Sequence, residues 1–286
     1  MVSLPSKWVK EHHIQKGHEL NVEEKEYSLV IHSGDVTILE KAELNLAKKD
    51  QFLKRYLRSL YHRGFAEVKI TCEEGIDIQE IKKELDTYLG FEIIEQGKKY
   101  CIIRNVADTM EKEFSIILRK IFLMNATMAD DSLSHIRSSH YAALHDTATI
   151  ERTNNKLVNL SYRVLNKSGK LSDQELMSLY TILLCLENIA DFYRDLCDYA
   201  AKKKIKLGKD LDEFYAHINL HYHQLAELYY KFDPAKMLAL RDQRTHLEQK
   251  AHELHEKMNS PAIVHYLRSI LNYMKDMELC IGFGSH

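Results

Sequence analysis

The stretch from Ser172 to Lys203, SDQELMSLYTILLCLENIADFYRDLCDYAAKK, decides the fold. It contains neither Gly nor Pro, it is rich in good helix formers, and its apolar residues recur every three to four positions. Ser172 and Glu175 have the spacing of a capping box, in which the two residues bind each other's backbone at the start of a helix. The pattern predicts one long helix over residues 172–204.

The same character extends on both sides of this helix. From residue 98 to residue 281 the only helix breakers are Gly169, Gly208, Pro234 and Pro261, and the two prolines suit first-turn positions. Short connections make consecutive helices antiparallel neighbours, so we expect two three-helix bundles side by side, with an approximate internal duplication. The six predicted helices cover residues 110–142, 144–167, 172–204, 208–231, 234–257 and 261–281.

The first hundred residues have a different pattern, because Gly and Pro interrupt them often and the apolar runs are short. Helices are predicted over residues 7–13, 50–63 and 78–89, and strands over 26–32, 36–39, 66–72, 91–95 and 100–104. The expected fold is therefore an α+β N-terminal region followed by an all-α domain. The expected domain boundaries are residues 1–40, 41–108 and 109–286.

The composition excludes several classes of protein. Of the 286 residues, 45% are apolar and 29% are charged, which is typical of a folded soluble protein. Forty Lys and Arg against 42 Asp and Glu leave no general excess of positive charge for DNA, so nucleic-acid binding would need a local patch. Five cysteines without a C-x-x-C pair indicate a reducing compartment. We expect a cytoplasmic location without membrane insertion, because neither a spanning segment nor a signal peptide is recognisable.

An acidic stripe is the most distinctive local pattern. Glu187, Asp191, Asp195 and Asp198 fall within a sector of about 80° on the long helix, opposite an apolar sector. Carboxylates one turn apart can supply oxygen ligands to a divalent or trivalent metal ion when a second helix completes the site. The alternative is a solvated helix face on which Arg194 pairs with Asp191 and Asp198.

Histidines offer a second possible metal site. Glu213, His217 and His221 are spaced at four-residue intervals, and a second row lies further along the chain at Glu248, His252 and His255. Such rows can bind zinc or nickel, but they are also common on half-exposed helix faces. No His has a Glu three positions before it, which disfavours a ferritin-like oxidase.

Signatures of catalysis are missing from the sequence. It contains no G-x-x-x-x-G-K-[ST], G-x-G-x-x-G, G-x-S-x-G or H-E-x-x-H pattern. Nothing supplies a nucleophile and a base in a recognisable setting. We therefore predict that the protein is not an enzyme.

Two segments resemble known families. The opening VSLPSKWVKEHHIQKGHELNVEE, Val2 to Glu24, resembles the SpoVT/AbrB-type swapped-hairpin domain. The helical half resembles the PhoU family of phosphate-uptake regulators, whose E-R-I-A-D-type motif is matched from Glu187 to Asp191. The order of these segments is similar to the archaeal form of such regulators. The AbrB-like match is carried by Ser3, Leu4, Pro5, Trp8, Val9, Ile14, Gly17 and Glu19.

The PhoU resemblance implies iron or zinc bound at paired acidic motifs. The candidate ligands are Glu187, Asp191, Asp195 and, on the last helix, Asp276. The sequence departs from the family pattern where acids are expected on partner helices. Asn154 and Val158 occupy those positions on the second helix and Asn272 on the last, and the nearest candidates on the fifth helix are Asp242 and His246.

The resemblances imply a non-enzymatic regulator of phosphate uptake and homeostasis. It would contact a phosphate transporter or a signalling protein through the helical domain and form a homodimer through the AbrB-like segment. The alternative is an AbrB-type DNA-binding transcriptional regulator with a ligand- or metal-sensing helical domain. This segment has almost no strand before the V-S-L-P turn, and its lysines face six acids by residue 35, so it offers little positive charge to DNA.

Overall fold

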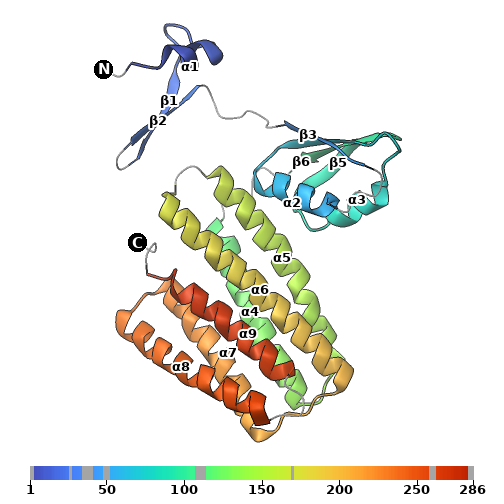
Figure 1. The fold of residues 1–286 in the computed structure, drawn as a ribbon, viewed down its shortest axis with the longest axis vertical. Coiled ribbons are helices and arrows are strands. Elements are labelled where there is room, and N and C mark those ends of the chain that lie inside the picture. The colour runs from blue at the N-terminus through green and yellow to red at the C-terminus, as the bar shows by residue number, and fades with distance from the viewer. Residues whose placement is uncertain are drawn as a thin grey trace. The chain divides into compact units, whose positions relative to one another are not determined.

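The structure is a computed structural model, and it describes residues 3–25, 28–33, 41–47, 52–106, 114–168, 171–257 and 262–282. The chain forms two compact units, residues 1–41 and residues 42–286. In outline, small α+β elements precede a region made of long helices (Figure 1). The predicted order of an α+β region followed by an all-helical region is confirmed.

The first unit contains a short helix and a β-hairpin. Helix α1 is Ser6–Glu11, and strand β1, Leu20–Lys25, pairs antiparallel with β2, Ser28–Ser33. The predicted strand over residues 26–32 thus corresponds to β2. Apolar alternation did not predict β1, because three consecutive charged residues interrupt it, although the AbrB-like pattern has a strand at this place. The predicted strand over residues 36–39 lies outside the described residues.

Residues 41–105 form a four-stranded sheet with two helices on one face (Figure 1). The strand order is β3-β4-β6-β5, and β6 is antiparallel to both β4 and β5. The core between sheet and helices includes Leu57, Tyr61, Ile70, Ile81 and Ile103. Strand β3 was not predicted. The elements are β3 Lys41–Asn45, α2 Leu53–His62, β4 Glu67–Thr71, α3 Ile78–Leu85, β5 Phe91–Gln96 and β6 Tyr100–Asn105.

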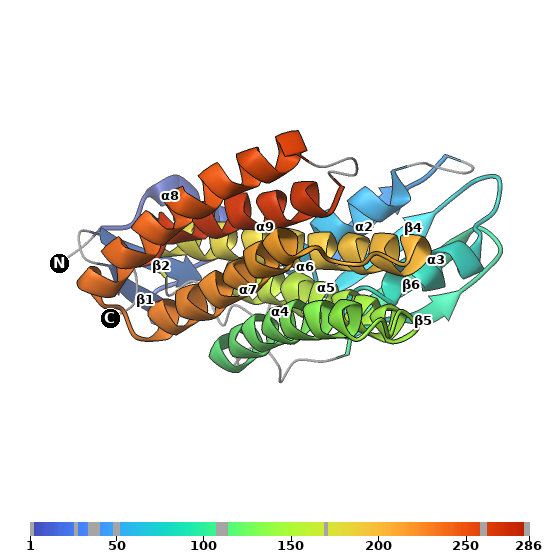
Figure 2. The same cartoon turned by 90° about the horizontal axis from the view of Figure 1, so that it is seen from below.

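The six predicted long helices are all present and share one hydrophobic core. Helix α6 packs against α4, α5 and α9, while α7 packs against α4, α8 and α9. Figure 2 shows these helices running side by side along their length. Their bounds are α4 Phe114–Arg137, α5 Ala143–Lys167, α6 Asp173–Lys203, α7 Lys209–Tyr230, α8 Pro234–Lys257 and α9 Ala262–Glu278.

Helix α6 begins at the predicted capping box. The Ser172 hydroxyl accepts a hydrogen bond from the Glu175 backbone N–H at 3.3 Å, and the Glu175 carboxylate accepts one from the Ser172 backbone N–H at 2.8 Å. Among the described helices, only α6 is long and apolar enough to cross a membrane, and 39% of its apolar window is buried. A core helix passes the same test, so its place in the shared core accounts for this composition.

Candidate functional site

The acidic stripe lies on α6, opposite the side chains that this helix buries. Ile189, Tyr193 and Leu196 are fully buried, whereas the side chains of Asp191 and Asp195 are 37% and 43% exposed. Asp198 is also exposed, but Glu187 keeps only 15% of its side-chain surface in contact with solvent. The predicted separation of the two faces is therefore confirmed, with Glu187 as the covered end of the stripe.

Arg58 from α2 covers this end. Its Nη2 atom donates to both carboxylate oxygens of Glu187, at 3.0 and 3.1 Å. Burial raises the pKa of Glu187, and the positive charge of Arg58 acts against that rise. Sequence reasoning missed this pair, because 129 residues separate its members and no local pattern connects them.

Arg194 neutralises the middle of the stripe. It donates to Asp191 at 2.6 Å and to Asp195 at 2.9 Å, and it forms an ion pair with Glu151 of α5 at 3.0 Å. The solvated-face alternative paired Arg194 with Asp191 and Asp198. The structure has the pair with Asp191, but the second partner is Asp195 in place of Asp198. The arginine thus joins carboxylates from two helices.

Glu151 is the carboxylate that sequence reasoning overlooked on α5. Its side chain is 8% exposed, it accepts a hydrogen bond from Asn155, and burial raises its pKa. It lies about one turn before Asn154, one of the two positions at which the family pattern expects an acid. The available signal was the (i, i+4) pair Glu151 and Asn155, of which Glu151 reaches α6 through Arg194.

This geometry bears directly on the proposed metal ligands. Among the described residues, no group of three or more His, Cys, Asp or Glu side chains could hold a metal ion. Glu187 faces Arg58, and Asp191 and Asp195 face Arg194. Asp276 is exposed on α9, with no hydrogen bond or ion pair to the other three in the described part of the chain. The arrangement does not fit iron or zinc, because guanidinium groups take the positions that a cation would need.

The histidine rows do not converge either. Glu213 and His217 are exposed on α7, while His221 is completely buried. His252 and His255 are exposed on α8, as the half-exposed alternative predicts. His221 is the exception, and it belongs to a different arrangement.

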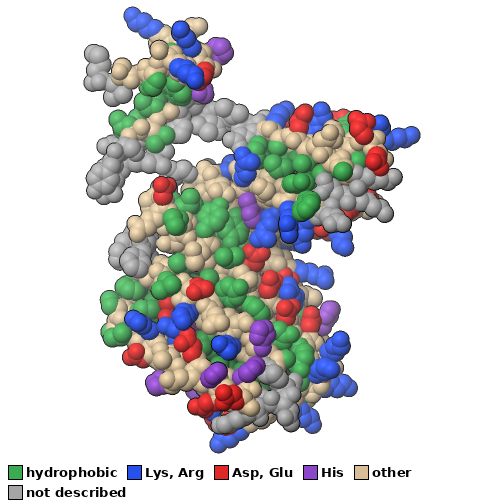
Figure 3. Space-filling view, viewed as in Figure 1, with side chains coloured by type: hydrophobic (Ala, Val, Ile, Leu, Met, Phe, Trp, Pro, Cys, Tyr) green, Lys and Arg blue, Asp and Glu red, His purple; other side chains and the backbone are tan. Residues whose placement is uncertain are grey.

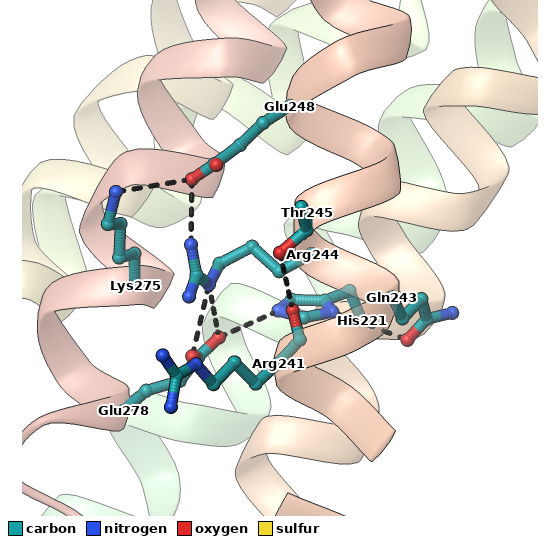
Figure 4. A network of polar contacts seen from close by, with 8 residues as sticks. All are labelled: His221, Arg241, Gln243, Arg244, Thr245, Glu248, Lys275 and Glu278. Carbon is teal, nitrogen blue, oxygen red and sulfur yellow. Dashed lines mark hydrogen bonds and ion pairs between the residues drawn. The ribbon is translucent and has the colours of Figure 1, made fainter. Parts of the chain in front are cut away.

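That arrangement is a polar network joining α7, α8 and α9, with His221, Arg244 and Glu278 at its buried end (Figure 4). The Nε2 atom of His221 lies 3.2 Å from Glu278, which also accepts hydrogen bonds from Arg244 Nε at 3.2 and 3.1 Å. Arg244 donates further to Glu248 at 2.8 Å, and Lys275 reaches the same carboxylate at 3.4 Å. The network contributes fixed polar contacts between three helices.

A second buried arginine connects α5 to the α+β elements through hydrogen bonds. Arg163, 1% exposed, donates to the backbone carbonyls of Tyr61 and Phe65, both at 3.0 Å. His62 lies 2.7 Å from Asn159 in the same interface, and burial lowers the pKa of His62 to about 4. The imidazole is therefore neutral at physiological pH. These contacts and the ion pair between Arg58 and Glu187 together place α2 next to the acidic stripe of α6.

Comparisons of the chain with protein-family models, with curated proteins and with solved structures find no match. The assignment of function therefore depends on the residues quoted above and on the geometry around α6.

Proposed function

We propose that this chain is a non-enzymatic regulator of phosphate uptake, built on a PhoU-like helical domain and acting through contact with a transporter or signalling protein. The observation that carries the proposal is the E-x-I-A-D segment of α6, Glu187 to Asp191, in a helix that packs against α9. We take α4–α6 as one three-helix bundle and α7–α9 as a second. The last helices of the two bundles, α6 and α9, pack against each other.

The placement of the two motif positions on each helix supports this grouping. Glu187 and Asp191 lie one turn apart on α6, and Asn272 and Asp276 have the same spacing on α9. The corresponding positions thus fall on the last helix of each group, as a duplication requires. The absence of catalytic motifs in the sequence agrees with action through contact.

The hairpin of the first unit supports dimer formation. Val22 is 57% exposed and Leu29 is 54% exposed on β1 and β2, and a single two-stranded hairpin is at best marginally stable alone. Pairing with the same hairpin of a second copy would cover these side chains. We therefore propose a homodimer formed through the AbrB-like segment.

The proposal is tested in the organism that encodes the chain. Deletion of the gene is expected to change phosphate uptake and polyphosphate content when cells move between low and high phosphate, and the wild-type gene is expected to restore both. Recovery of a phosphate transporter or its sensor with the tagged protein would identify the contact. A deletion strain with an unaltered phosphate response would contradict the proposal.

A further inference from the structure

Helix α2 carries several positive charges, of which only Arg58 takes part in the contacts described so far. The residues from Gln51 to Ala66 include Lys54, Arg55, Arg58 and Arg63 but no Asp or Glu. The whole chain has a formal charge of −2, so this is a local concentration of charge rather than part of a general excess. In Figure 3, Lys and Arg side chains gather where α2 lies, and Asp and Glu side chains lie below them.

The two sides of α2 differ in what they contact. Leu53, Leu57 and Tyr61 are buried in the core beneath the sheet, and Arg58 pairs with Glu187. At 100° per residue, five further side chains share a sector of about 100° that faces away from this core. We call this the outer face of α2, and it consists of Phe52, Arg55, Tyr56, Ser59 and Arg63, all of which are exposed.

The outer face combines cations with aromatic rings. Phe52 is 49% exposed and Tyr56 is 39% exposed, and the Arg55 guanidinium lies 5.6 Å from the Phe52 ring centre. Arg63 lies in the same way over Phe65, at 5.0 Å. Neither Arg55 nor Arg63 forms an ion pair within the described part of the chain, so both guanidinium groups can bind external anions.

The arrangement of the rings and cations decides between anionic partners. Single-stranded nucleic acid is bound by open ring faces on which bases stack, whereas Arg55 already lies over Phe52 and Arg63 over Phe65. The major groove of DNA, about 12 Å wide, admits a single helix, whereas α2 packs against both α3 and α5. The headgroup layer of a membrane attracts Arg and Lys through anionic lipids and accommodates aromatic side chains at its interface.

We propose that the outer face of α2 binds the surface of membranes that contain anionic lipids. Arg55 and Arg63 lie at the lipid phosphates, and Phe52 and Tyr56 lie among the headgroups. The binding is peripheral, because the apolar side of the helix stays buried in its own core. This proposal stands independently of the phosphate-regulator function, since it depends only on the charge and exposure of α2.

The test is co-sedimentation of the full-length protein with vesicles of phosphatidylglycerol and phosphatidylcholine, compared with phosphatidylcholine alone. Arg55→Ala with Arg63→Ala is expected to weaken binding roughly 25-fold, at about fivefold for each cation removed. Lys202→Ala with Lys206→Ala, both exposed near the end of α6, removes the same charge and is expected to leave binding within about twofold. Circular dichroism verifies that each variant is folded.

A third variant tests the aromatic contribution. Phe52→Ser with Tyr56→Ser is expected to reduce the binding that persists at high salt, where the charge contribution is screened. The proposal is overturned if the wild-type protein does not sediment with phosphatidylglycerol vesicles at low salt, or if both charge variants lose binding equally. Arginine-dependent retention of duplex DNA without vesicle binding would also overturn it and would assign the surface to nucleic acid.

Discussion

The ion pair between Arg58 and Glu187 joins the α+β elements to the acidic stripe, and its removal tests how the stripe is stabilised. We consider Arg58→Met, which keeps most of the aliphatic stem and removes both hydrogen bonds to Glu187. The carboxylate then stays in a site where only 15% of its side chain is exposed and where burial already raises its pKa. The variant therefore measures how much the free energy of unfolding falls when a largely buried carboxylate loses its partner.

The expected cost follows from the geometry. A hydrogen bond to a charged group contributes about 1.5–3 kcal/mol, and an unsatisfied buried partner costs a similar amount. The Arg58 side chain is 42% exposed, so solvent screens part of the interaction, and we expect a loss of ~2 kcal/mol at neutral pH. Glu187→Gln in the same background removes the buried charge and is expected to recover about half of that loss.

The effect must depend on pH in a defined direction. Without Arg58, the pKa of Glu187 rises further above its usual value of 4.5, since burial is opposed by less positive charge. The folded state then binds the proton more tightly than the unfolded state, and stability falls as pH increases through that range. The loss of stability in Arg58→Met is therefore expected to be small at acidic pH, where Glu187 is protonated, and largest at neutral pH.

The assay is urea unfolding followed by circular dichroism, for wild type, both single variants and the double variant. The cycle should give a coupling free energy of about 1 kcal/mol or more. Arg137→Met is the matched control, because it removes a comparable pair with Asp212 in which the arginine is 49% and the aspartate 29% exposed, and it should cost under ~1 kcal/mol. A coupling near zero, or a loss that does not diminish in acid, would refute the reasoning.

Further predictions concern three other polar residues, Arg163, His62 and Arg244. Arg163→Met removes the guanidinium donor to the carbonyls of Phe65 and Tyr61, of which Tyr61 keeps the Gly64 N–H, and it should lower the free energy of unfolding by about 3 kcal/mol. A loss under ~1 kcal/mol would mean that water replaces the guanidinium. Burial lowers the pKa of His62 to about 4, so its NMR signals should show no titration between pH 6 and 8. Because the unfolded state takes up this proton first, stability should decrease as pH falls from 6.5 toward 4, and His62→Gln should reduce that decrease. Arg244→Met should speed amide hydrogen exchange in α8 more than in α6, and equal acceleration in both would show that the network has no local effect.

Much of the secondary structure could be predicted because its causes are local. The six long helices follow from apolar spacing and from breakers at their ends, and the capping box at Ser172 and Glu175 needs only residues three apart. The pattern of apolar residues did not predict strands β1 and β3, because their local signal is weak. Their sequences, LNVEEK and KAELN, contain one β-branched residue between them and are rich in charge, and pairing with neighbouring strands stabilises them.

The sequence by itself also located the acidic stripe, since residues at four-residue intervals share a face of any helix. Only the tertiary structure decided what meets that stripe. Arg58 is 129 residues from Glu187, and Glu151 reaches Arg194 only because α5 and α6 are packed side by side. Partners of buried charges are selected by how helices pack, a property of the complete core that no single segment contains. For this reason a stripe that suggests metal ligands from its spacing is found paired with arginines in the folded protein.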